Sequence, residues 1–131
     1  MRRAAVAAIR CATAAVWLCF GLLFKVLGLL PRHEAIVARV VGAAWAHQVT
    51  FLVGLAESTL AVWILSGWRP VWAAAAQTVA IGTMNTIELS VARDLLLAPL
   101  PMVAGNVVLL GCAWWAAVQP YGPRGGMPGP A

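Results

Sequence analysis

A carboxylate in the middle of an apolar segment is the first feature of this sequence that points to chemistry. Glu57 lies within FLVGLAESTLAVWIL, residues 51–65, and Lys25 lies near the end of an earlier apolar segment. Charged side chains within membrane helices are costly and face the protein interior, where they pair or serve a ligand or proton path. We expect Glu57 to pair with Lys25, with a hydroxyl or with water. Lys25 is a candidate because a lysine side chain reaches far along its helix.

Three further polar residues extend this candidate site. Asn85 and Glu88 are three residues apart and therefore share a helix face, and Arg93 follows near the expected end of that helix. An alternative makes Arg93 an anchor at the membrane interface. The predicted ligand-binding or proton site consists of Lys25, Glu57, Asn85, Glu88 and Arg93.

The sequence leaves three interpretations of the Lys25–Glu57 pair open. The first is a buried ion pair that fixes the register of two helices. The second is a proton relay or a ligand site, for example for quinone, whose head group needs an apolar slot and a proton donor. The third is that the second span begins earlier than its apolar residues indicate, which would leave Glu57 shallow.

No catalytic constellation accompanies these residues. Ser58 and Thr59 adjoin Glu57, but neighbouring residues do not face each other on a helix, so we expect their hydroxyls to bond backbone carbonyls. His33 and His47 are expected on the same side of a membrane, yet they lack the spacing of a metal-binding motif. We therefore predict no metal site and no enzymatic activity of the chain on its own.

The composition indicates a membrane protein. Of 131 residues, 63% are hydrophobic and 10% are charged, against about a quarter charged in soluble domains. Apolar segments at about 11–30, 48–65, 71–89 and 102–118 are each near the ~20 residues that cross a bilayer. We predict an all-α membrane protein, a four-transmembrane-helix bundle forming a single domain over residues 1–119, with a disordered Pro/Gly-rich tail at 120–131.

Shorter patterns add detail to this bundle. Ile36, Val40 and Trp45 recur at helical spacing after Pro31, which predicts a short amphipathic interfacial helix between helices 1 and 2. Asn106 is expected to form an interhelical hydrogen bond. Small residues that would let membrane helices approach closely are Gly21, Gly28, Gly54, the alanines at 73–76, Gly82, Gly105 and Gly111.

The net charge of +5 indicates an orientation in the membrane and not nucleic-acid binding, because the basic residues are scattered over the ends of apolar segments. Arg2 and Arg3 precede the first helix, whose flanking charges usually dominate topology. We predict a multi-pass protein of the cell membrane (inner or plasma), with the lipid bilayer as its surroundings and both termini in the cytoplasm.

Four segments together resemble the DoxX-like family of small four-span membrane proteins: VWLCFGLLFKVLG, PRHEAIVARV, VGLAESTLAVWILSGW and ARDLLLAPLPMVAGNVVLL. The G-x-x-x-K segment from Gly21 to Lys25 and the mid-span Glu57 are the most informative parts. The resemblance covers roughly residues 14–110. It implies a four-helix membrane protein, and some relatives serve membrane redox work as subunits of quinone-linked sulfur oxidation or partners of detoxifying oxidoreductases.

This resemblance favours a non-catalytic accessory or anchor subunit of a membrane-linked redox system. Quinone is then the candidate ligand, and a soluble or membrane oxidoreductase is the candidate partner. Two alternatives remain open. One is a small proton-coupled carrier that uses Glu57 and works as a homodimer, and the other is a structural or lipid-binding protein without turnover.

Overall fold

The computed structural model describes residues 1–120, so the predicted tail at 120–131 lies, apart from its first residue, outside the described part of the chain. All regular secondary structure within residues 1–120 is helical, which confirms the all-α prediction. The elements in chain order are α1 (Arg2–Leu18), the π-helical η1 (Cys19–Val26), α2 (Pro31–Val41), α3 (Ala43–Ser66), α4 (Pro70–Val91), the short 3-10 helix η2 (Arg93–Leu95) and α5 (Pro99–Ala117).

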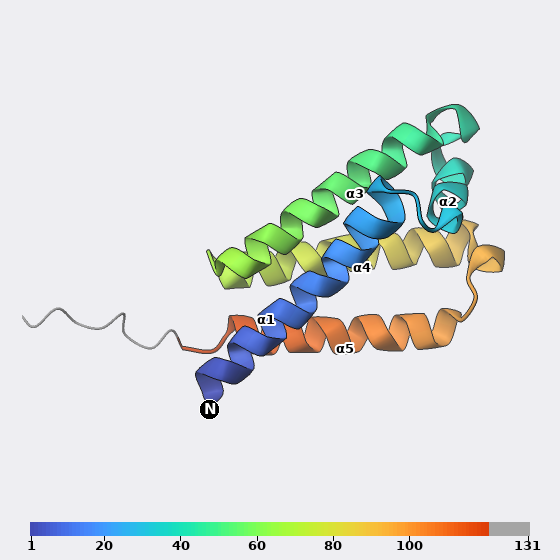
Figure 1. The fold of residues 1–131 in the computed structure, drawn as a ribbon. Helices are drawn as coiled ribbons and strands as arrows, with labels where there is room; N and C mark the ends of the chain where they lie inside the picture. Colours follow the sequence, from blue (N-terminus) through green and yellow to red (C-terminus); the bar gives the residue numbers. More distant parts are fainter. Residues whose placement is uncertain (121–131) are drawn as a thin grey trace, which may run out of the picture.

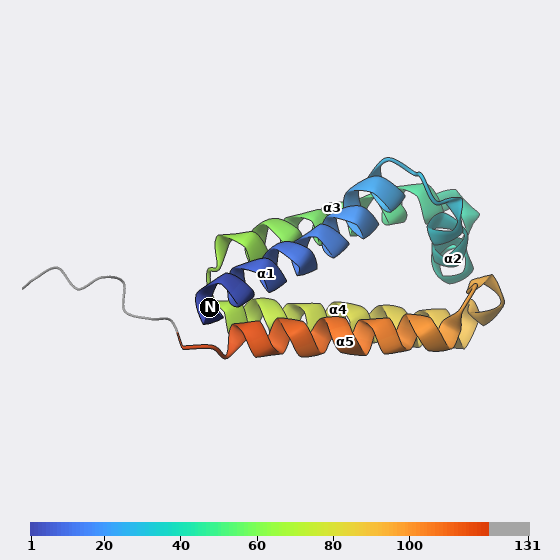
Figure 2. The same ribbon diagram turned by 60° about the horizontal axis from the view of Figure 1, so that its bottom comes forward.

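The four long helices form two layers. Figure 2 shows α1 beside α3 in one layer and α4 beside α5 in the other, in agreement with the contacts between these elements. The short helix α2 crosses one end of the bundle, where the connection between α4 and α5 also lies (Figure 1). The start of α1 and the end of α5 lie at the opposite end.

Three helical segments are long and apolar enough to cross a membrane: Arg2–Val26, Ala43–Ser66 and Pro99–Ala117. The remaining long helix, α4, has 22 residues, which is enough to cross a hydrocarbon core. Its apolar character is interrupted by Gln77, Asn85 and Glu88. Composition therefore establishes three candidate spans in the described chain, and the fourth needs a structural argument.

The first long helix ends before the position that its apolar residues suggest. The predicted segment reached residue 30, whereas η1 ends at Val26 and the chain turns at Gly28, whose φ is +67°. The amide of Leu27 donates to the carbonyl of Leu22 at 2.9 Å, a bond across five residues that continues the π-helical pattern. The turn directs the chain into α2.

The helix predicted after Pro31 is present as α2, and it is separate from α3. Pro31 begins α2 with a fixed φ that suits a first helical position, and Gly42 separates the two helices with a φ of +86°, which favours glycine. Ile36 is buried against the bundle, whereas Val40 and Trp45 are exposed. The apolar side chains of this region therefore point in two directions.

The hydrophobic core lies mainly toward the end that holds the chain start. Its buried residues are Ala14, Trp17, Ala61, Ile64, Ala73 and Ile81. Within it, the indole Nε1 of Trp17 donates to Oε1 of Gln77 at 3.0 Å. We call this region, with Gln77, the closed end.

Candidate functional site

A cavity of about 460 Å³ lies between the helix layers on the side of the bundle that α2 covers. Its polar lining residues are Lys25, Arg32, His33, Glu57, Asn85, Glu88 and Asn106. The other lining residues are apolar: Val16, Trp17, Phe20, Ile36, Ile81, Met84, Leu96, Leu97, Ala98, Pro101, Met102 and Leu109. The volume is within the range of small-molecule sites. We call this region the cavity end.

A close crossing of η1 and α3 positions the charged pair of the cavity. A Cβ added to Gly21 would lie 2.7 Å from the carbonyl oxygen of Gly54, and one added to Gly54 would lie 2.7 Å from that of Gly21. Small residues permit this approach in membrane helices. Lys25 follows Gly21 by one turn and Glu57 follows Gly54 by nearly one turn, so the crossing brings both side chains into reach.

Lys25 and Glu57 form the ion pair that the sequence predicts. The ammonium Nζ of Lys25 donates to both carboxylate oxygens of Glu57, each at 2.8 Å. The two side chains are only 7% and 4% exposed. Nζ also lies 5.7 Å from the ring centre of Phe20, close enough for a cation–π contact. Lys25 belongs to the π-helical η1, and π-helical turns within α-helices are frequent at functional sites.

The opposite wall of the cavity comes from α4 and α5. The amide Nδ2 of Asn106 donates to Oδ1 of Asn85 at 2.9 Å, which confirms the interhelical hydrogen bond predicted for Asn106. Glu88 follows Asn85 on the same face of α4 and also lines the cavity. Lys25 and Arg32 are near enough to act electrostatically on Glu88, yet its carboxylate makes no hydrogen bond or ion pair within residues 1–120.

Helix α2 contributes a buried histidine and a partly buried arginine. His33 is 8% exposed and stacks on Phe24, with ring centres 5.9 Å apart, while Phe20 meets it edge-on at 5.9 Å. Nε2 of His33 and Nε of Arg32 are buried without a hydrogen-bond partner in the described chain. Burial, followed by the charges of Lys25 and Arg32, lowers the pKa of His33 from 6.5 to about 4, so its imidazole is neutral at pH 7.

The structure brings four of the five predicted site residues together. Lys25, Glu57, Asn85 and Glu88 line the cavity, whereas Arg93 is exposed and does not. Sequence analysis did not assign Arg32 or His33 to the site. Their position directly after Pro31, on the side where Lys25 was expected, is the signal that could have included them.

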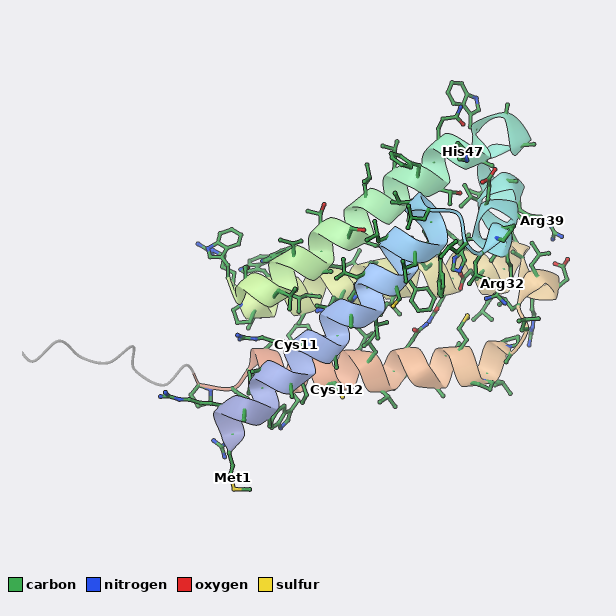
Figure 3. The ribbon with its side chains drawn as sticks, viewed as in Figure 1. Met1, Cys11, Arg32, Arg39, His47 and Cys112 are labelled. Atoms are coloured by element: carbon green, nitrogen blue, oxygen red, sulfur yellow. The ribbon has the colours of Figure 1, made fainter. Side chains whose placement is uncertain are left out.

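A second ion pair lies outside the cavity, where α2 meets the end of α4. The guanidinium of Arg39 donates to both carboxylate oxygens of Asp94 at 2.8 and 2.7 Å, and to the carbonyl of Val91 at 3.2 Å. The hydrogen bonds from Arg39 lower the pKa of Asp94. Figure 3 shows Arg32 and Arg39 at the α2 end of the bundle, with Met1 at the far end.

Neither the hydroxyls next to Glu57 nor the two histidines form a catalytic or metal-binding arrangement in the described chain. The hydroxyls of Ser58 and Thr59 donate to the carbonyls of Gly54 and Leu55, each at 2.8 Å, as predicted. His47 is exposed on α3, where Nδ1 lies 3.2 Å from a carboxylate oxygen of Glu34 (Figure 3). The two histidines therefore do not share a site.

Comparison with known proteins supports the resemblance seen in the sequence. The profile of the DoxX-like family matches residues 14–114. This stretch contains every residue that lines the cavity. No curated protein and no solved structure matches the chain.

Proposed function

The chain belongs to the DoxX-like family, and we propose that it is a four-span membrane protein that binds a quinone between its helix layers. In this proposal it is a non-catalytic accessory or anchor subunit of a membrane-linked redox system. The observation that carries the proposal is the cavity of about 460 Å³, whose lining combines charged and polar side chains, among them Lys25, Arg32 and His33, with many apolar ones. A quinone combines a polar head group with an apolar tail and needs both kinds of surroundings.

The fourth span of this proposal is α4, whose polar residues face inward. Gln77 is buried and bonded to Trp17, Asn85 is bonded to Asn106, and Glu88 lines the cavity. Exposed large side chains on the same helix are apolar or aromatic: Val71, Trp72, Val79 and Val91. Polar residues in membrane helices face the bundle interior in this way, so the surface that α4 offers to lipid is suitable for a span.

The helix directions support placing the start of α1 and the end of α5 on the same side of the membrane. The start of α1 and the end of α5 lie together, opposite α2 (Figure 1). Arg2 and Arg3 lie at that end, and a positive flank of the first helix favours the cytoplasm. We therefore propose cytoplasmic termini in the inner or plasma membrane, with α2 at the outer interface.

An accessory role fits the chemistry of the cavity better than catalysis by this chain. Ser58 and Thr59, the hydroxyl side chains next to Glu57, are bonded to backbone carbonyls of their own helix. The lining offers groups that hold a head group and exchange protons with it. Electron transfer would then belong to an oxidoreductase partner that uses the bound quinone.

The first test is to find the ligand. We would purify the whole chain in a mild detergent, extract it with organic solvent and search for quinone by absorbance and mass spectrometry. We expect near-stoichiometric quinone, or stoichiometric rebinding of added decylubiquinone. A protein that is empty and does not rebind decylubiquinone would contradict the proposal.

A matched pair of variants tests the location. Leu109 lines the cavity, and the neighbouring Val108 is 66% exposed. Leu109→Trp should fill the cavity and reduce quinone content at least fivefold, whereas Val108→Trp should leave it unchanged. Equal quinone content in both variants would place the ligand elsewhere.

A further inference from the structure

The cavity end contains two buried polar atoms that the chain itself does not satisfy. Nε2 of His33 and Nε of Arg32 have no partner within residues 1–120, and both residues line the cavity. Buried polar groups in folded proteins are nearly always hydrogen-bonded, so an exception calls for an explanation such as a bound molecule. The two residues are adjacent on α2, which covers this end of the bundle.

The imidazole of His33 is held in place by two aromatic side chains of η1. Phe24 stacks on it with an angle of 29° between the rings, and Phe20 meets it at 73°. These apolar contacts fix the ring without using its nitrogens. The orientation of His33 is therefore set by packing, and Nε2 is left for a group that is not part of the described chain.

The donor and acceptor capacities of the two residues define what they can bind. A guanidinium has only donors, so Arg32 needs an oxygen that accepts. A neutral imidazole has one donor and one acceptor nitrogen, so His33 can donate to a carbonyl or accept from a hydroxyl. Lys25 and Arg32 balance the charges of Glu57 and Glu88 in the cavity lining, and His33 is neutral, so the lining carries no net formal charge, which favours a neutral ligand.

We propose that α2 is the recognition element for the quinone head group, with Arg32 Nε donating to one ring oxygen and His33 Nε2 bonding the same end of the ring. This inference rests on the quinone binding proposed above. His33 donates to the carbonyl of the oxidised ring and accepts from the hydroxyl of the reduced ring. The site consequently binds quinone and quinol alike, as an accessory subunit that exchanges its ligand with an oxidoreductase requires.

The test is a titration of the whole chain in detergent with decylubiquinone and, separately, decylubiquinol. Quenching of tryptophan fluorescence reports binding, because Trp17 lines the cavity. His33→Phe removes Nε2 while keeping an aromatic ring in contact with Phe20 and Phe24. We expect its Kd for both probes to rise at least tenfold, and His33→Gln, which retains a donor and an acceptor, to recover part of that loss.

The matched control is His47→Phe, because the His47 side chain is 75% exposed and lies outside the cavity. It should bind both probes as the unmodified chain does. If the unmodified chain and His33→Phe bind the probes equally well, the proposed role of α2 is wrong, although the proposed quinone binding stands. If the unmodified chain binds neither probe, the proposed function fails and the inference fails with it.

A variant at Arg32 keeps the test decisive if His33→Phe does not fold. Arg32→Met removes the buried Nε donor but retains an apolar stem of similar reach. We expect at least a fivefold higher Kd for decylubiquinone. A Kd within twofold of the unmodified chain would overturn the assignment.

Discussion

The closed end and the cavity end of the bundle both contain polar side chains in its interior, but they satisfy them differently. At the closed end, Trp17 donates to Gln77 at 3.0 Å among buried alanines, and the hollow nearby has only about 20 Å³. At the cavity end, the Lys25–Glu57 pair borders about 460 Å³ of space, and Nε2 of His33 has no hydrogen-bond partner among residues 1–120.

This difference distinguishes a polar contact with a structural role from a ligand-binding site. The neutral Trp17–Gln77 bond satisfies its donor and acceptor within the chain, so nothing else is needed there. The cavity end joins a satisfied ion pair to groups that are not satisfied, so it combines a structural element with a binding surface. Variants at the two ends should therefore affect stability and ligand binding in different proportions.

The largest effect is expected from removing one partner of the ion pair. Glu57→Ala leaves the buried ammonium of Lys25 without the carboxylate that pairs with it, and breaking a buried pair in this way costs about 3–5 kcal/mol. The measurement is the free energy of unfolding in mixed detergent micelles. Adding Lys25→Met should restore most of the loss, because replacing both partners can be nearly neutral.

Glu34→Ala is the control, since the side chain of Glu34 is 46% exposed. It should change the free energy of unfolding little. A similarly small effect of Glu57→Ala would mean that water in the cavity solvates Lys25, and the cavity end would then be wet and not a dry ligand site.

The next largest effect concerns the crossing that creates the pair. Gly54→Ala would place a Cβ 2.7 Å from the carbonyl oxygen of Gly21, and a clash with backbone is expected to cost about 3 kcal/mol. It should also lower quinone binding, because the shift of η1 moves Lys25. Gly82→Ala meets nothing within 4 Å and should be neutral or slightly stabilising in thermal unfolding. Equal destabilisation by both changes would refute this account.

Gly54 and Gly82 also show how much of the fold can be predicted from the sequence. Apolar segments and one mid-span carboxylate were enough to predict an all-α chain and the Lys25–Glu57 contact. Glycine content alone did not identify the close crossing, because Gly82, Gly105 and Gly111 have open space where a Cβ would lie. Which glycine faces a neighbour depends on helix rotation, and that is set by packing of the whole bundle.

The cavity itself could not be predicted for a related reason. Its polar lining combines residues from η1, α2, α3, α4 and α5, and the distances between them depend on how far apart the two layers lie. His33 was visible in the sequence, but only the stacking on Phe24 and the absence of a partner for Nε2 mark it as part of the site. Arg93 was expected to join the group because it follows Glu88 near the expected helix end, but α4 ends at Val91 and Arg93 is exposed.

A change at the closed end should separate stability from binding. Gln77→Leu removes the acceptor of the buried Trp17 Nε1, and a buried donor left without a partner costs about 1–3 kcal/mol. Gln77 does not line the cavity, although its partner Trp17 does. The free energy of unfolding should therefore fall by this amount, while the Kd for decylubiquinone changes much less than in His33→Phe. A large loss of binding would show that the two ends are coupled, and the comparison between them would no longer hold.

The smallest effect is a pH dependence that belongs to the cavity end alone. His33 has a pKa of about 4 in the folded chain, against 6.5 when unfolded, because of burial and the positive charges of Lys25 and Arg32. Between these values the unfolded chain binds more protons, so folding stability decreases as the pH falls. From pH 6.5 to 5.5 the contribution of His33 to the loss is about 1 kcal/mol.

The pH effect is measured by comparing unfolding of the unmodified chain and His33→Phe over the same pH range. Glu57 and Glu88 also line the cavity and remain in both proteins, so the difference between the two curves isolates His33. The variant should lose less stability on acidification. Parallel curves would mean that His33 gains its proton equally in both states, and a bound water or a nearby carboxylate would then have to satisfy Nε2 in the folded chain. A protonated His33 could still donate to the carbonyl of a quinone, but it could not accept from the hydroxyl of a quinol.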